Sequence, residues 1–206
     1  GSLSPSEGAR LVRARGQAMQ AAADARPGTM TAVLGLAPEE VEDACAAVPD
    51  AWVANDNAPG QVVISGTTEG VGLAGQAALQ RGAKRVIPLQ VGGAFHSPLM
   101  APAQEHLDAA LALGRFADST CPVVANVDAQ PHADGFAPLL SAQLCSRVRW
   151  RESLLTLAGM GARVFVELGP GTELTGMVRR TVPGAARANV AAPQDIATVE
   201  KALEAL

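Results

Sequence analysis

The stretch AWVANDNAPGQVVISG, residues 51–66, contains two short strand-like runs separated by a turn. AWVAND and QVVISG supply the runs, and Ala58-Pro59-Gly60 supplies the turn between them. Proline and glycine mark chain reversals, whereas β-branched and aromatic residues favour strands. The stretch therefore predicts a strand, a turn and a second strand, and this pair decides how the flanking segments are interpreted.

The segments on either side of this pair complete a recognisable unit. TAVLGL (31–36) predicts a strand and PEEVEDACAAV (38–48) a helix, while residues 68–81 predict a second helix and KRVIPLQV (84–91) a last strand. The resulting order over residues 29–91, β-α-β-β-α-β, is the split arrangement of ferredoxin-like domains. We therefore predict a compact ferredoxin-like subdomain at 29–91, inserted between residues 1–28 and 92–206.

The N-terminal segment predicts a helix with one unusual residue on its inner face. Ser4-Pro5-Ser6-Glu7 combines an N-cap serine, a first-turn proline and a capping-box glutamate, and the helix is expected to reach about Ala25. Leu11, Val12, Arg15 and Met19 are expected to share the face that turns inward. Arg15 then needs an anion, which is either an internal Asp or Glu or a carboxylate ligand held by its planar fork.

A histidine stands in the segment GGAFHSPLM, residues 92–100. Ser97 and Pro98 predict a helix start, with the helix running to about Leu113. The positive end of a helix dipole disfavours imidazolium, so His96 is expected to stay neutral and able to accept a proton. The alternative is a loop histidine that is merely hydrogen-bonded near a helix end.

The remaining segments predict an α/β layer that is partly parallel. Strands are expected at PVVANV (122–127), RVFVEL (163–168) and 187–190, and helices at 136–147, 150–160, 172–181 and 193–206. Few strands lie outside residues 29–91, so this layer is expected to be incomplete. Gly169-Pro170-Gly171 predicts a tight turn rather than a dinucleotide loop, because Leu174 occupies the third glycine position of G-x-G-x-x-G.

Composition excludes several classes of protein. The net charge is −4 and aromatic residues make up 3% of the chain, which argues against nucleic-acid binding. No apolar run is long enough for a membrane span, and the three scattered cysteines suit a reduced cytoplasm better than a disulfide frame or zinc site. No G-x-S-x-G nucleophile elbow occurs, and Ser65 lacks the flanking glycines of one.

Several segments taken together resemble the malonyl-CoA:acyl-carrier-protein transacylase family and the related acyltransferase domains of polyketide synthases. In chain order the matching pieces are RARGQAMQ (13–20), NAPGQVVISG (57–66), AFHSPLM (94–100), ANVD (125–128), 143–150 and ELGPG (167–171). The resemblance implies an α/β-hydrolase-like core with the ferredoxin-like insertion described above. It implies malonyl transfer from malonyl-CoA to the phosphopantetheine thiol of an acyl carrier protein, without a metal or redox cofactor.

The resemblance also implies roles for four residues. His96 would be the base that activates a serine, and the backbone carbonyl of Gln143 would orient the histidine. Arg15 would bind the free carboxylate of malonate. Phe95 would favour malonyl over methylmalonyl, because a bulky ring leaves no room for the extra methyl group.

One element of the family pattern is not found in these residues. The family's G-H-S-x-G elbow lies upstream of the helix that carries Arg15, so we expect the nucleophilic serine in a missing N-terminal segment and expect this chain alone to be inactive. Two alternatives remain open: an acyltransferase domain of a polyketide synthase, and a non-catalytic module that binds a carrier protein.

Overall fold

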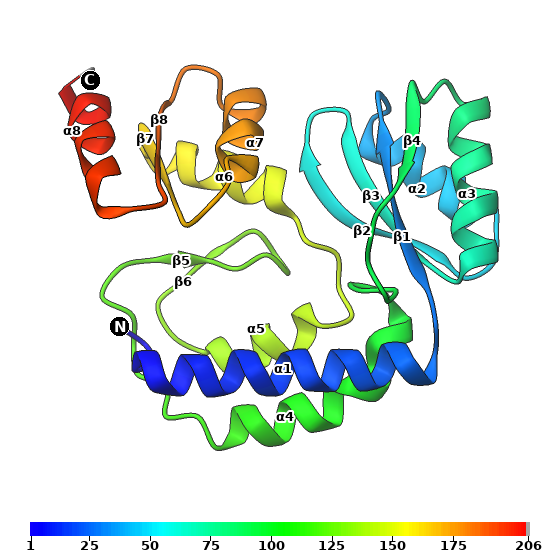
Figure 1. Ribbon diagram of the computed structural model, residues 1–206, viewed down its shortest axis with the longest axis horizontal. Coiled ribbons are helices and arrows are strands. Elements are labelled where there is room, and N and C mark those ends of the chain that lie inside the picture. The colour runs from blue at the N-terminus through cyan, green and yellow to red at the C-terminus, as the bar shows by residue number, and fades with distance from the viewer. Residues whose placement is uncertain (205–206) are drawn as a thin grey trace.

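The computed structural model describes residues 1–204 as an α/β protein in which three small sheets are surrounded by helices (Figure 1). The largest sheet lies on one side of the molecule with helices α2 (Pro38–Ala46) and α3 (Thr68–Gln80). The long helix α1 (Pro5–Ala25) runs along the bottom of the view next to α4 (Gln104–Ala112) and α5 (Phe136–Gln143). No helix among the described residues is long and apolar enough to cross a membrane.

Helix α1 begins as predicted, but its buried face differs. The Ser4 hydroxyl accepts a hydrogen bond from the Glu7 backbone amide at 3.3 Å, and the Ser4 amide donates to the Glu7 carboxylate at 3.2 Å. Val12, predicted to turn inward, is 70% exposed. The buried positions are Ala18, Met19, Ala22 and Ala23. Val12 was assigned wrongly because the contacting stripe follows positions 11, 15, 18, 19 and 22, and position 12 lies beside this stripe.

The four-stranded sheet is antiparallel throughout and follows the order β2-β3-β1-β4. Its strands are β1 (Thr29–Leu34), β2 (Ala51–Ala58), β3 (Gln61–Gly66) and β4 (Arg85–Pro88). The predicted element order within residues 29–91 is confirmed, although β4 is shorter than the predicted strand 84–91. Gly35, with a φ of 93°, ends β1 two residues before the predicted end.

The sheet buries a different apolar cluster on each face. Side chains alternate between the faces of a strand, and so Val62 and Ile64 of β3 pack with Val41 of α2 and Val71 of α3. Val63 of β3 faces the other way, where the cluster is completed by Met30, Ala32 and Ala54. This second face turns toward the rest of the molecule and carries the contacts that matter for the site.

The helix predicted from Ser97 to about Leu113 is divided into two parts. A 3-10 helix, η1 (Pro98–Ala103), precedes α4. Pro102 lies inside η1, and a proline in a helix interior removes an amide donor and clashes with the preceding turn. The two segments pack with α1 around a core of Met100, Leu107, Leu111 and Leu144.

The remaining elements form two small sheets with covering helices. Strand β5 (Val123–Val124) is shorter than the predicted strand 122–127 and pairs with β6 (Pro131–His132), which was not predicted. Strands β7 (Val164–Leu168) and β8 (Ala186–Val190) pair in parallel, as expected. Helices α6 (Trp150–Gly159) and α7 (Glu173–Thr181) accompany them, followed by a 3-10 turn, η2 (Pro193–Asp195), and α8 (Ile196–Glu204). The last two residues of the predicted helix 193–206 lie outside the described residues.

Candidate active site

His96 occupies a backbone conformation that is uncommon for a residue with a side chain. Its φ is 57°, in the left-handed region, where histidine is tolerated better than most residues but still at a cost. The next residue, Ser97, is fully buried and locks this turn. Its hydroxyl donates to the Ala94 carbonyl at 2.6 Å and accepts from the Leu99 amide at 3.3 Å. Ser97 is thus a structural cap, as predicted, and not a free nucleophile beside His96.

The imidazole of His96 meets the end of helix α5. Its Nδ1 lies 3.3 Å from the backbone carbonyl oxygen of Gln143, a residue 47 positions further along the chain. A carbonyl oxygen can only accept a hydrogen bond, so this contact favours the tautomer with the proton on Nδ1. Nε2 is then left unprotonated and able to accept a proton. The structure therefore brings together two of the residues selected from the sequence.

Arg15 lies half-buried on α1 without a carboxylate partner. No Asp or Glu oxygen among residues 1–204 comes within 4.0 Å of its guanidinium. Burial lowers the pKa of Arg15 from its ordinary value, and no acidic group counters this effect. The internal ion pair considered from the sequence is therefore not what the structure contains. A half-buried cation without a counter-charge can accept an anionic ligand.

The pKa of His96 is lowered, as expected from the sequence, but for a different reason. Burial is the largest cause, the Gln143 carbonyl opposes it, and the positive charge of Arg15 lowers the pKa further. The sequence argument invoked the dipole of an α-helix, whereas the element that follows His96 is a 3-10 helix. His96 is neutral at pH 7 because charging it would place a second cation near Arg15 in a desolvated site.

Phe95 is half-buried between two of the apolar clusters. It packs against the α1–α4 core and also against the cluster on the inner face of the four-stranded sheet. Gly93 lies close beneath the ring, since a Cβ placed on this glycine would lie 3.0 Å from the ring atom Cε1 of Phe95. The ring is thus held by the two clusters and by the close approach of the Gly93 backbone.

The Gly-Pro-Gly segment after β7 is a tight turn, as predicted. Gly169 and Gly171 have φ values of 127° and 95°, which only glycine adopts readily. The Glu167 carboxylate accepts from the backbone amides of Leu174 at 3.2 Å and Thr175 at 2.8 Å. The chain's own carboxylate thus accepts the free backbone amides at the start of α7, the type of donor that binds phosphate in nucleotide loops.

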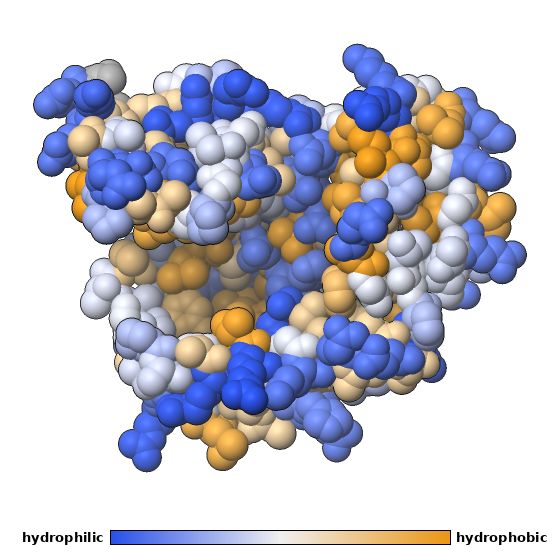
Figure 2. Space-filling view, viewed as in Figure 1, coloured by the Kyte–Doolittle hydropathy of each residue, from blue (hydrophilic) through white to orange (hydrophobic). Residues whose placement is uncertain are grey.

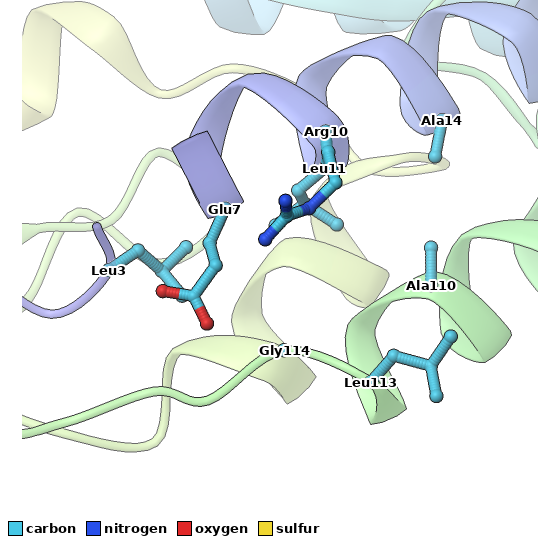
Figure 3. Close-up of a pocket in the computed structure, with 8 residues that line it drawn as sticks. All are labelled: Leu3, Glu7, Arg10, Leu11, Ala14, Ala110, Leu113 and Gly114. Atoms are coloured by element: carbon cyan, nitrogen blue, oxygen red, sulfur yellow. The ribbon is translucent and has the colours of Figure 1, made fainter. Parts of the chain in front are cut away.

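Two cavities border the helices that carry predicted residues. One of about 390 Å³ is lined by Gln143 together with mainly apolar residues of the β5 segment and α5. Another of about 220 Å³ lies between α1 and α4, with Glu7 and Arg10 at its polar edge (Figure 3). This second cavity contains none of the predicted site residues. Figure 2 shows that the surface is also hollowed between the α1–α5 region and the β7–β8 region.

Comparisons with known proteins show the family of the chain. A family model described as an acyl transferase domain matches residues 1–200. The chain belongs to the acyl transferase family. A malonyl CoA-acyl carrier protein transacylase from Bacillus subtilis is 39% identical over all of this acyl transferase chain and 66% of its own length. The relative of that name from Synechocystis is 38% identical over 92% of the chain and 63% of its own length. The chain therefore spans slightly less than two thirds of these relatives.

Solved structures resemble the acyl transferase chain over nearly its whole length. The malonyl-CoA:acyl carrier protein transacylase from Xanthomonas oryzae superposes with a TM-score of 0.92 at 38% identity, covering 98% of this chain and 66% of that one. A malonyl-transacylase in complex with a type II polyketide acyl-carrier protein superposes with a TM-score of 0.87 at 37% identity, covering 96% and 64%. Relatives of the chain thus occur both among general transacylases and in polyketide biosynthesis.

Sequence reasoning missed one buried ion pair between β2 and α6. Asp56 on β2 is 2% exposed, and Arg151 on α6 reaches it with its guanidinium. A signal for it existed, because Asp56 shares the inward phase of β2 with Ala54 and Ala58. A carboxylate on the buried phase of a strand calls for a cation, by the same logic that singled out Arg15 on α1.

Proposed function

We propose that the acyl transferase chain is part of a malonyl-CoA:acyl-carrier-protein transacylase. The observation that carries this proposal is a half-buried histidine held through Nδ1, together with a nearby arginine that has no carboxylate partner among residues 1–204. A neutral imidazole can activate a nucleophile, and an unpaired guanidinium can bind the free carboxylate of malonate. The names of the transacylase relatives support the same activity.

The proposed reaction proceeds through a seryl ester. Nε2 of His96 takes the proton of a serine hydroxyl as the serine oxygen attacks the thioester carbonyl of malonyl-CoA, and the imidazolium then protonates the departing CoA thiolate. In the second half, Nε2 takes the proton of the phosphopantetheine thiol of the carrier protein, whose sulfur attacks the ester. The serine oxygen leaves and recovers a proton from His96. Each step moves only protons and an acyl group, so we propose that no metal or redox cofactor takes part.

Three residues support His96 in this proposal. The Gln143 carbonyl fixes the tautomer, Arg15 holds the malonyl carboxylate, and Phe95 excludes a methyl-branched acyl group. We propose that the serine belongs to sequence outside these 206 residues. The 206 residues contain no G-x-S-x-G, and Ser97 is buried with its hydroxyl committed to the Ala94 carbonyl.

We also propose a division of the fold. Residues 29–91 would be a ferredoxin-like subdomain inserted into an α/β-hydrolase-like core formed by residues 1–28 and 92–206. The element order and the antiparallel strand order β2-β3-β1-β4 support the first assignment, and the parallel pair β7–β8 supports the second.

The test uses radiolabelled malonyl-CoA and a carrier protein, with this chain joined to the upstream segment of a transacylase relative. His96→Ala is expected to lower malonyl transfer by about 10²–10⁴-fold, the usual worth of a general base. The matched control is His106→Ala, because His106 is exposed on α4 and should leave transfer unchanged. Labelling of the 206-residue chain alone by malonyl-CoA would contradict the assignment of the serine to an upstream segment. Full transfer by the His96→Ala variant would contradict the role of His96.

A further inference from the structure

The segment between α5 and α6, residues 143–151, connects the His96 contact to the four-stranded sheet. At its start, the Gln143 carbonyl faces His96, and the Gln143 side-chain amide donates to the carbonyls of Ser146 at 2.9 Å and Arg147 at 3.3 Å. These bonds close a compact turn at the end of α5. The Gln143 carbonyl also accepts from the Ser146 amide at 3.3 Å, so its direction is coupled to this turn and to the path of the segment after it.

The middle of the segment extends the sheet. Val148 donates its amide to the Ala54 carbonyl at 2.7 Å and accepts from the Asp56 amide at 2.9 Å. Strand β2 is the edge strand of the sheet order, so it has a free side for this contact. Its pairing with β3 is irregular on both sides of Asn55 and Asp56, at the place where Val148 is bound. The bulged edge of β2 is thus fitted to this one segment.

The end of the segment is fixed by a buried ion pair. The Nε atom of Arg151 lies 3.0 Å and 2.9 Å from the two carboxylate oxygens of Asp56, and a terminal nitrogen lies 2.7 Å from one of them. The Asp56 side chain is 3% exposed and that of Arg151 is 24% exposed. A second ion pair joins Arg147 of the segment to Glu42 of α2. It is much more exposed, since 37% of the Arg147 side chain and 47% of the Glu42 side chain are accessible. Screening by water weakens the exposed pair far more than the buried one.

A competing anchor exists next to Gln143. Leu144 is fully buried in the core formed with α1 and α4. Packing of one apolar side chain fixes the position of the chain but leaves the backbone free to rotate about that anchor. Helix α5 is also bonded to α4, because the Gln104 amide donates to the Ser141 hydroxyl at 3.1 Å, but none of its residues is fully buried. The orientation of the Gln143 carbonyl then needs a second fixed point beyond the turn.

We propose that Asp56 and Arg151 are positioning residues, which hold residues 143–151 against β2 so that the Gln143 carbonyl meets Nδ1 of His96. The catalytic importance of this ion pair rests on the proposed function of His96. Its effect on the direction of the Gln143 carbonyl concerns this chain alone. The carboxylate and the guanidinium fork act as one unit at the far end of the segment, and neither touches the imidazole.

The test is a nitrogen NMR measurement on the 206-residue chain labelled with ¹⁵N-histidine. The chain has only three histidines, His96, His106 and His132, so each ring can be assigned with a His→Gln variant. Long-range proton–nitrogen correlations distinguish the Nδ1–H tautomer from the Nε2–H tautomer. In the unchanged chain above the pKa of His96, we expect the Nδ1–H form to predominate. Asp56→Asn is expected to lower the ratio of Nδ1–H to Nε2–H by about fivefold, the net worth of one hydrogen bond.

Matched controls separate positioning from general damage. Glu42→Gln removes the exposed ion pair on the same segment and should leave the His96 ratio unchanged. His132 supplies an internal reference, because its Nε2 lies 2.9 Å from the Asp128 carboxylate and its signal should stay constant in every variant. The double variant Asp56→Asn/Arg151→Gln should shift the ratio no further than Asp56→Asn does, because the two residues act as one pair.

An unchanged His96 ratio in folded Asp56→Asn would overturn the proposal and assign the orientation of Gln143 to Leu144 and the backbone bonds of Val148. If Asp56→Asn loses the His132 reference signal through unfolding, Arg151→Lys replaces it, since lysine keeps the charge and loses only the fork. An unchanged ratio in Arg151→Lys would then refute the proposal. The tautomer is measured without substrate, so failure of the transacylase assay and failure of this inference are separate results.

Discussion

Replacing Arg15 with methionine should stabilise the ligand-free chain while destroying its affinity for a carboxylate. The guanidinium is half-buried, its pKa is lowered by burial, and no carboxylate among residues 1–204 pairs with it. Methionine keeps an unbranched aliphatic side chain on the helix face of Met19, one turn before it, and removes the desolvated charge. Because the group is only partly buried, we expect a modest gain of about 0.5–2 kcal/mol in the free energy of unfolding.

The assay is urea and thermal unfolding of the 206-residue chain at neutral pH. For a chain of this size, each kcal/mol corresponds to a shift of about 2–4 °C in Tm. Arg13→Met is the matched control, since Arg13 is exposed on the same helix and its replacement should change stability by less than about 0.5 kcal/mol. Arg15→Lys should bring no such gain, because lysine keeps the desolvated charge.

The same variant should behave oppositely in an enzyme that also carries the serine. Losing one partner of a close charge pair costs about 2–5 kcal/mol, which corresponds to a fall in kcat/KM for malonyl-CoA of about 30- to 5,000-fold. Transfer of an acetyl group, which has no free carboxylate, should not fall in parallel. A clear loss of stability in ligand-free Arg15→Met, with Arg13→Met unchanged, would refute the view that Arg15 waits for an external anion.

Two further predictions concern Phe95 and His96. Phe95→Ser should raise the ratio of methylmalonyl to malonyl transfer by about 10- to 200-fold, the usual discrimination for one methyl group in a pocket. An unchanged ratio in competition assays would show that Phe95 does not limit the size of the acyl group. Burial lowers the pKa of His96 from 6.5, the positive charge of Arg15 lowers it further, and the Gln143 carbonyl partly opposes both effects. The folded state therefore binds fewer protons than the unfolded state as the pH falls below 6.5. Stability from neutral His96 is thus complete above 6.5 and is lost as the pH falls through the folded pKa. The urea midpoint should therefore fall more steeply between about pH 7 and pH 5 in the unchanged chain than in His96→Gln, and parallel curves would contradict the lowered pKa.

Much of the local structure could be predicted because the signals are short-range. The capping box of Ser4 and Glu7, the turn at Pro59-Gly60 and the Ser97 cap each involve residues within a few positions of one another. The errors also have local causes. Val12 was assigned to the buried face of α1 because the predicted apolar face was too wide. Pro102 divides a segment that the apolar pattern predicted as one continuous helix.

Other features depend on distant parts of the chain. The apolar pattern did not predict β6, since a two-residue strand exists only through its pairing with β5. Asp56 and Arg151 are 95 positions apart, and each looks like an ordinary charged residue until the fold buries one beside the other. The contact between His96 and Gln143 was expected only through the resemblance to a family, because no spacing rule joins residues that far apart.

The sequence alone determined the order of the elements and the side chains able to act as a base or bind an anion. It also showed that a cation stands on the inner face of α1. Only the tertiary structure decided that Arg15 has no carboxylate partner among residues 1–204, that burial and a nearby charge lower the pKa of His96, and that its Nδ1 meets a carbonyl. Caps, turns and periodicity depend on residues that are close in the sequence, so the sequence alone can predict them. Protonation states and hydrogen-bond partners are set by desolvation and by which distant groups packing brings within reach, so they exist only in the folded chain.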